Sequence, residues 1–105
     1  MFTGLVADLG SVAALDATPD GVRLRVRTAL AGELSDGDSV AVNGVCLTAV
    51  EPDAESFGAD VMHETLRRSS LAAVEAGTRV NLEVDILAKY VEKLMSPPAN
   101  GAARP

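Results

Sequence analysis

The side chains best suited to chemistry begin with Cys46 and Thr48, a thiol and a hydroxyl two positions apart. Successive side chains of a strand point to opposite faces, so these two share one face if the segment is extended. Together they could line a pocket for a polar ring, at the interior or the mouth of a small barrel. The alternative is that both are small core residues, because free cysteine is often buried and threonine favours strands.

A second polar group consists of His63, Glu64 and Thr65, which follow a short apolar segment and open a stretch of helix formers over 62–68. A strand-to-helix junction of this kind exposes backbone N–H groups that suit carbonyl or anionic ligand atoms. The alternative is that Glu64 and Thr65 only cap the helix. Cys46 and His63 could also form a nucleophile–base pair, although the sequence gives no geometry for one.

The composition argues against several other kinds of site. With one histidine, one cysteine and no cluster of hard ligands, the chain shows no recognised metal spacing, and its scattered glycines form no phosphate loop. A net charge of −6 and a single adjacent basic pair, Arg67 and Arg68, argue against a nucleic-acid partner. No apolar run approaches the length of a membrane span and no secretory segment opens the sequence, so the expected location is the cytoplasm.

The elements that must position these residues are six short strands, spaced as in a small barrel or sandwich. Residues 39–50 predict two of them, joined by a turn at Asn43 and Gly44, because Asn-Gly accepts positive φ at low cost. The other four are expected over 2–7, 22–27, 56–61 and 79–84. A turn is expected over 16–21, and a loop with a short helical turn over 30–38.

The clearest alternation lies in residues 22–27, where three apolar side chains face one way and three arginines the other. This pattern is typical of a half-buried antiparallel strand. The arginines could form an anion site, but the pattern favours a solvated, charged outer face. The three are Arg23, Arg25 and Arg27.

From Asp85, a plausible N-cap, the pattern changes to the period of a helix that ends at Pro97 and Pro98. A helix of about ten residues is marginal alone, so its apolar stripe must pack on the barrel or on the same helix of another subunit. The expected organisation is a barrel domain over 1–84, a helix over 85–95 and a flexible tail over 96–105. The stripe consists of Ile86, Leu87, Tyr90, Val91, Leu94 and Met95.

Four motifs, in this order and spacing, resemble the N-terminal half of riboflavin synthase, of the lumazine-binding family. They are MFTGLV at 1–6, VNGVCLT at 42–48, DVMHETL at 60–66 and GTRVNLE at 77–83. The resemblance implies an all-β fold, a six-stranded Greek-key barrel with a short internal helix and a C-terminal oligomerisation helix. It places a ligand ring at the barrel mouth, in contact with Phe2, Gly4, Leu5, Val6, Ser39, Cys46, Leu47, Thr48, Asp60, Val61, Met62, His63, Glu64 and Thr65.

The sequence departs from this family after Leu82 and Glu83. A riboflavin synthase has two such halves in tandem, whereas here residues 84–94 look like the end of the second half. We therefore expect the second barrel and its linker to be missing. The resemblance also implies a homotrimer assembled through residues 86–95. A closed threefold ring cannot pair three barrel mouths face to face, because such pairing needs a local twofold axis.

Three functions remain open for such a chain. It could bind riboflavin, FMN, FAD or 6,7-dimethyl-8-ribityllumazine near a subunit interface, and so act as a small flavoenzyme. It could be a riboflavin synthase that dismutates two stacked lumazine molecules, with Cys46, Ser39 and His63 as candidate catalytic residues. It could also be a non-enzymatic carrier of either ligand. Without the second barrel, we expect Cys46 to line the pocket rather than to react.

Overall fold

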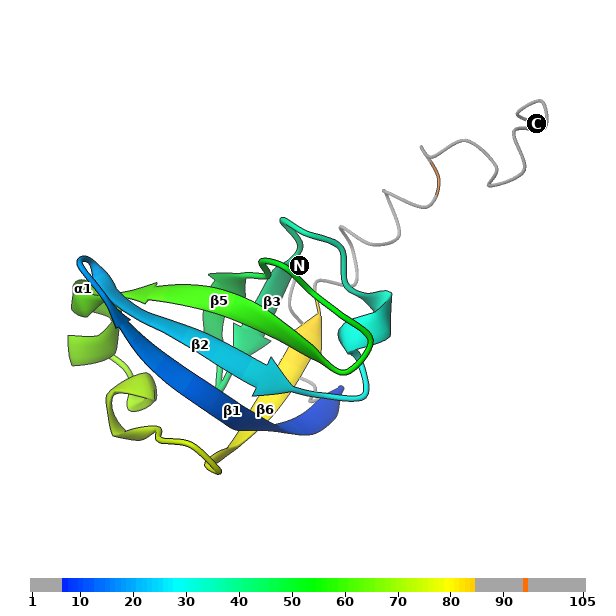
Figure 1. Cartoon of the computed structure of the whole chain (residues 1–105). Helices are drawn as coiled ribbons and strands as arrows, with labels where there is room; N and C mark the ends of the chain where they lie inside the picture. Colours follow the sequence, from blue (N-terminus) through cyan, green and yellow to red (C-terminus); the bar gives the residue numbers. More distant parts are fainter. Residues whose placement is uncertain (1–6, 85–93, 95–105) are drawn as a thin grey trace.

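A computed structural model of the chain describes residues 7–84 and Leu94, and residues 7–84 form a six-stranded antiparallel barrel (Figure 1). The barrel confirms the all-β fold expected from the sequence. Its elements are β1 (Asp8–Thr18), β2 (Gly21–Arg27), η1 (Ala31–Glu33), β3 (Ser39–Val42), β4 (Val45–Thr48), β5 (Ser56–Met62), α1 (His63–Arg67), η2 (Ser70–Ala73) and β6 (Arg79–Val84).

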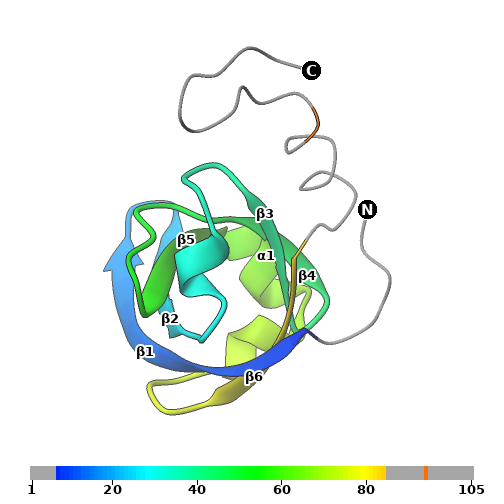
Figure 2. The same cartoon turned by 90° about the vertical axis from the view of Figure 1, so that its right-hand side faces the viewer.

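The strands follow the hydrogen-bonded order β4-β3-β6-β1-β2-β5, so β4 and β5 are the two ends of one curled sheet (Figure 2). The ends meet just beyond β4, where Val50 and Gly58 exchange two backbone hydrogen bonds of 2.8 and 2.9 Å. On the other side of that pair, no described ladder joins residues 46–48 of β4 to residues 60–62 of β5. We call this gap the seam.

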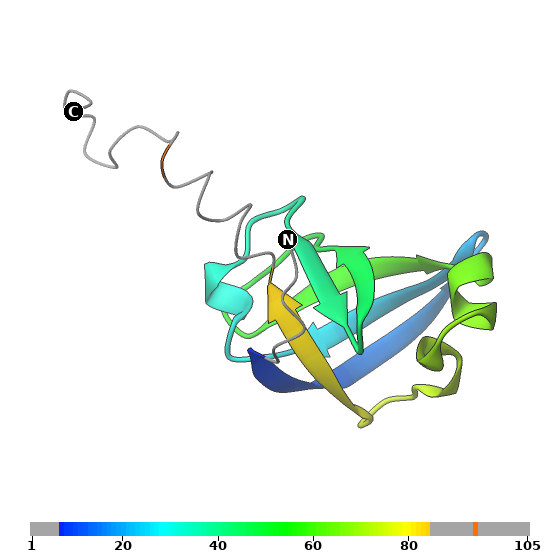
Figure 3. The same cartoon turned by 180° about the vertical axis from the view of Figure 1, so that it is seen from behind.

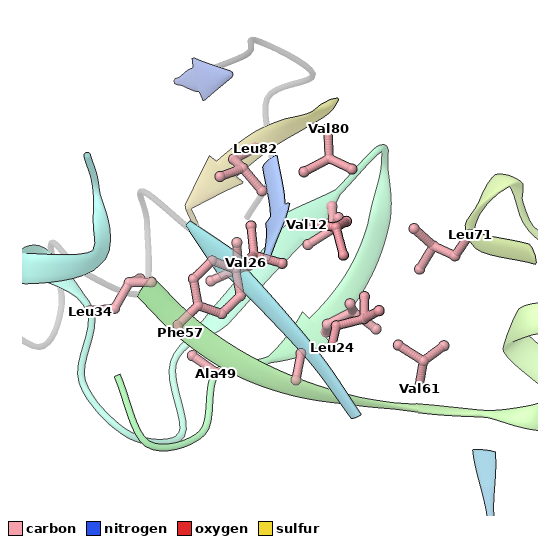
Figure 4. Packing of buried hydrophobic residues seen from close by; sticks show 14 residues of the cluster. Val12, Leu24, Val26, Leu34, Ala49, Phe57, Val61, Leu71, Val80 and Leu82 are labelled. Atoms are coloured by element: carbon pink, nitrogen blue, oxygen red, sulfur yellow. The ribbon is translucent and has the colours of Figure 1, made fainter. Parts of the chain in front are cut away.

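The barrel interior is filled by one face of each strand. In β2, Leu24 and Val26 are fully buried, while the three arginines that alternate with them face outward, as the alternation predicted. Phe57 is the largest buried side chain, and Leu34 and Leu71 lie at opposite ends of the cluster (Figure 4). The helical turns lie at the two ends of the barrel, with η1 at one end and α1 and η2 at the other (Figure 3).

The helix α1 and the turn at Asn43 and Gly44 confirm two local predictions, since both turn residues have positive φ (50° and 81°). The prediction was wrong for residues 8–18, which form the longest strand although no strand was expected there. A register shift between Val12 and Ala14 breaks the alternation that marks a strand in the sequence. The turn expected over 16–21 is correspondingly shorter, at residues 19–20.

Several predicted features lie outside the described residues. They are most of the strand expected over 2–7, the helix over 85–95 apart from Leu94, and the tail over 96–105. Their arrangement therefore stays a prediction.

Gly21 provides a test of how tightly β2 and β5 are packed. A Cβ atom there would lie 1.9 Å from the Val61 carbonyl oxygen and 2.8 Å from the Met62 Cα, both backbone atoms that the β2–β5 ladder holds in place. We expect Gly21→Ala to lower the free energy of unfolding by about 3 kcal/mol, as for severe overpacking. Urea denaturation would measure this change.

Gly32→Ala is the matched control, because the nearest atom to its new Cβ would be 4.0 Å away. Its free energy of unfolding should stay within about 1 kcal/mol of the parent value. Equal urea midpoints for the two variants would contradict the packing described at Gly21.

Candidate functional site

A cleft of about 330 Å³ lies at the seam, where β4, β5 and α1 come together. It unites two of the segments that the sequence singled out, although these lie more than ten residues apart in the chain. Its lining residues are Cys46, Leu47, Thr48, Val50, Asp60, Val61, Met62 and Thr65.

The side chains along the two walls alternate between the core and the solvent. Leu47 and Val61 are buried in the barrel, with 6% and 2% of their surface exposed. Their neighbours on β4, Cys46 and Thr48, are both exposed, as is Met62 on β5. Cys46 and Thr48 therefore share a face as predicted, and the alternative that they are core residues is wrong.

The backbone of β5 directs hydrogen-bonding groups into the seam. In an antiparallel strand, the N–H and C=O groups of successive residues point alternately to the two neighbouring strands. Gly58 points toward β4, because it exchanges hydrogen bonds with Val50, whereas the N–H of His63 donates to the Asp20 carbonyl on the opposite side. The β2–β5 register runs without a shift. Asp60 and Met62 therefore present their N–H and C=O groups to the seam.

The same alternation applies to the facing wall. Ala49 bonds toward the β3 side, since its N–H donates to the Asp38 carbonyl and its own carbonyl accepts from the N–H of Gly37. Cys46 and Thr48 lie four and two residues before Val50 on the same alternation. They consequently direct their backbone groups toward β5, as Val50 does. The cleft thus has a row of peptide donors and acceptors along each wall. Such rows can recognise a planar group with alternating donors and acceptors along its edge.

Arg23 binds the carboxylate of Asp60 through hydrogen bonds. Its Nε and Nη2 donate to the two carboxylate oxygens, the second at 3.0 Å, and its Nη1 donates to Glu51 at 3.1 Å. These hydrogen bonds lower the pKa of Asp60 and raise the pKa of Arg23. Since its side chain is engaged by β2, Asp60 contributes mainly peptide groups to the cleft.

The structure leaves some predicted contact residues at the edge of the site. Ser39 is not in the cleft lining but is the register partner of Thr48 on β3. His63 and Glu64 do not line the cleft either, and Glu64 forms ion pairs with Arg67 and Arg68. Phe2, Gly4, Leu5 and Val6 lie outside the described residues.

Two alternatives from the sequence are also decided here. The N-cap of α1 is Met62, with no side-chain cap hydrogen bond, so the idea that Glu64 and Thr65 cap the helix is wrong. In the described part of the chain no hydrogen bond joins Cys46 to His63.

Val50 is a lining residue that the sequence analysis missed. Its position, four residues after Cys46 on the same face of an extended segment, could have indicated it.

The described residues also bear on metals and membranes. Among residues 7–84 and Leu94, no group of three histidine, cysteine, aspartate or glutamate side chains could hold a metal ion. Within the same part of the chain, no helix is long and apolar enough to cross a membrane. Among the described residues, the polar groups that line the cleft are the Cys46 thiol, the Thr48 and Thr65 hydroxyls, the Asp60 carboxylate and peptide groups.

The Arg23–Asp60 pair predicts a titration that can be measured. In Arg23→Gln, the pKa of Asp60 should rise back toward its ordinary value, because the cation that stabilises the carboxylate is gone. A ¹³C NMR titration of the side-chain carboxyl would show this. In the parent chain, the stability due to this pair should be fully present above the ordinary aspartate pKa and be lost as the pH falls through the lower, folded value. An unchanged Asp60 titration in the variant would contradict the pairing.

Comparisons with known proteins agree with this geometry. The family model described as "Lumazine binding domain" matches residues 3–85. Riboflavin synthase of Mycobacterium tuberculosis is 50% identical over 86 residues, which cover 79% of this chain and 42% of the relative. Riboflavin synthase of Saccharomyces cerevisiae is 42% identical over 91 residues, which cover 79% of this chain and 38% of the relative. The chain thus spans about two fifths of the length of the curated relatives it matches, and it belongs to the lumazine-binding domain family.

Proposed function

We propose that the seam cleft binds the ring system of 6,7-dimethyl-8-ribityllumazine or of a flavin by its edge. Both ligands carry a pyrimidinedione edge on which carbonyl and N–H groups alternate. The observation that carries the proposal is the direction of the peptide groups of Asp60 and Met62, which face the seam opposite those of Cys46 and Thr48. The ring edge would take the place of a missing strand between two strand edges.

A cleft of this size holds one ring system and leaves one of the two faces of that ring uncovered. In the part of the chain that the structure describes, its lining comes from β4, β5 and the first turns after them. A dismutation between two lumazine molecules needs two rings held together, since most of its acceleration would come from proximity and orientation. A single barrel is therefore proposed to be a binding unit, and two copies related by a twofold axis would be needed to bring two rings face to face.

Riboflavin synthase activity is the second candidate. It is favoured by the 50% identity to the riboflavin synthase of Mycobacterium tuberculosis and by the exposed Cys46 thiol in the cleft lining. In that case one lumazine would give a four-carbon unit to the other. Cys46 and Ser39 would then assist proton transfer or addition to a ring.

Other properties belong to the same proposal. With a flavin bound, the ring would supply redox chemistry and the chain its pocket, as in a small flavoenzyme. Without a reaction, the same cleft would make the chain a carrier. The homotrimer through residues 86–95 and the cytoplasmic location remain predictions of the sequence.

A proline at position 62 tests the peptide contacts directly. The φ of Met62 is −75°, which proline adopts without strain, and its N–H faces the seam, so Met62→Pro removes a donor without removing a ladder hydrogen bond. We expect the Kd for riboflavin to rise about tenfold, because one ligand carbonyl loses its partner. Fluorescence titration with riboflavin, repeated with the lumazine, would measure the change.

Met62→Ala is the control, because it keeps the N–H and shortens a side chain that is already 61% exposed. Its Kd should stay within about threefold of the parent value, which corresponds to less than 1 kcal/mol. Urea midpoints would confirm that both variants are folded. Equal affinities of the proline and alanine variants would refute recognition through the peptide groups.

Cys46→Ser separates lining from catalysis. If Cys46 only lines the cleft, the Kd for riboflavin should change less than about threefold, since the hydroxyl replaces the thiol with little change of shape. Chromatography of the products formed from the lumazine would reveal synthase activity in the parent chain. Loss of that turnover in Cys46→Ser, with binding retained, would instead give Cys46 a catalytic role.

A further inference from the structure

A row of three polar side chains crosses the outer wall of the barrel away from the seam. Ser11 of β1 is the register partner of Arg27 on β2 and of Arg79 on β6, so the three lie side by side on neighbouring strands. Figure 1 shows these strands adjacent, with β1 between β2 and β6. The row faces outward, because Val12, Val26 and Val80, each next to one of its members, are buried in the core.

The charges of this row differ from those of the other arginines on β2. Arg23 pairs with Asp60 and Glu51, and Arg25 pairs with Asp53. Among the described residues, neither Arg27 nor Arg79 has a carboxylate partner. A chain with a net charge of −6 therefore keeps, on neighbouring strands, two guanidinium groups that form no ion pair with a described carboxylate.

The row lines a hollow of about 250 Å³. Its lining residues are Asp8, Leu9, Gly10, Ser11, Arg27, Thr28, Ala29 and Arg79, none of which belongs to the seam cleft. Asp8 brings a carboxylate to the same hollow, but that group already accepts hydrogen bonds from the Thr28 hydroxyl and the Ala29 N–H. Two cations against one anion leave the hollow with a net positive charge.

We propose that this hollow binds the phosphate group of a small molecule. Neighbouring strands lie about 4.8 Å apart, so the two arginines start about 10 Å from each other, and their long side chains can converge on one tetrahedral oxyanion above Ser11. Guanidinium groups match phosphate oxygens with paired hydrogen bonds, and the serine hydroxyl adds a third donor. The Asp8 carboxylate can accept from a hydroxyl of the ligand, which suits a phosphate ester of a polyol.

NMR titration of the ¹⁵N-labelled full chain tests this proposal, with inorganic phosphate and glycerol 3-phosphate as probes at constant ionic strength. We expect saturable shifts of the amide signals of Ser11, Arg27, Thr28 and Arg79. Arg27→Gln and Arg79→Gln should each raise the Kd at least fivefold, and the double variant should lose saturation. Arg68→Gln is the control and should leave the Kd unchanged, since Arg68 pairs with Glu64 on α1.

The two probes distinguish the source of the phosphate group. Tighter binding of glycerol 3-phosphate would assign the hollow to an ester, and tighter binding of inorganic phosphate would assign it to the free ion. The proposal is overturned if sodium chloride produces the same shifts, or if the arginine variants bind phosphate as the parent does. Riboflavin titration of the same variants distinguishes the two sites, because the Kd of these variants for riboflavin should equal that of the parent chain.

Discussion

Two hydrogen bonds between Val50 and Gly58 join the two edges of the sheet, at β4 and β5. Their position determines most of the geometry of the site. The pair requires a close approach, since a Cβ on Gly58 would lie 3.1 Å from the Val50 carbonyl oxygen. It closes the barrel next to the end of β4 and leaves the remainder of the two edges apart. It also determines which residues of each strand point their N–H and C=O groups into the gap, because these groups alternate from one residue to the next.

The walls of the seam cleft consequently consist of peptide groups as well as side chains. Asp60 shows this most clearly: its carboxylate is bound by Arg23 on the neighbouring strand, so its peptide group is what faces the cleft. Buried Leu47 and Val61 hold the two walls in the core, while the exposed side chains between them surround the opening. Core residues thus fix the two edges, and peptide groups of the same strands face the cleft.

Much of the fold could be predicted from residue periodicity. The arginine–apolar alternation of β2 and the Asn-Gly turn gave the correct elements because each leaves a local signature. The longest strand was missed, because the register shift between Val12 and Ala14 interrupts its pattern. For the site, the segments around Cys46 and Met62 were identified through resemblance, but their meeting at an open seam depends on strand order, which no local pattern contains. The pairing of Asp60 with Arg23 is equally non-local, since 37 residues separate them.

The open seam also has a consequence for how this chain behaves in a crowded solution. Within residues 7–84, no ladder pairs the β4 edge with the β5 edge along the seam, and unpaired strand edges can be extended by a strand from another molecule. The exposed Met62 and the uncharged Cys46 and Thr48 offer little repulsion against such an addition. A ring bound in the seam as proposed would block the addition of such a strand, because both would use the same peptide groups.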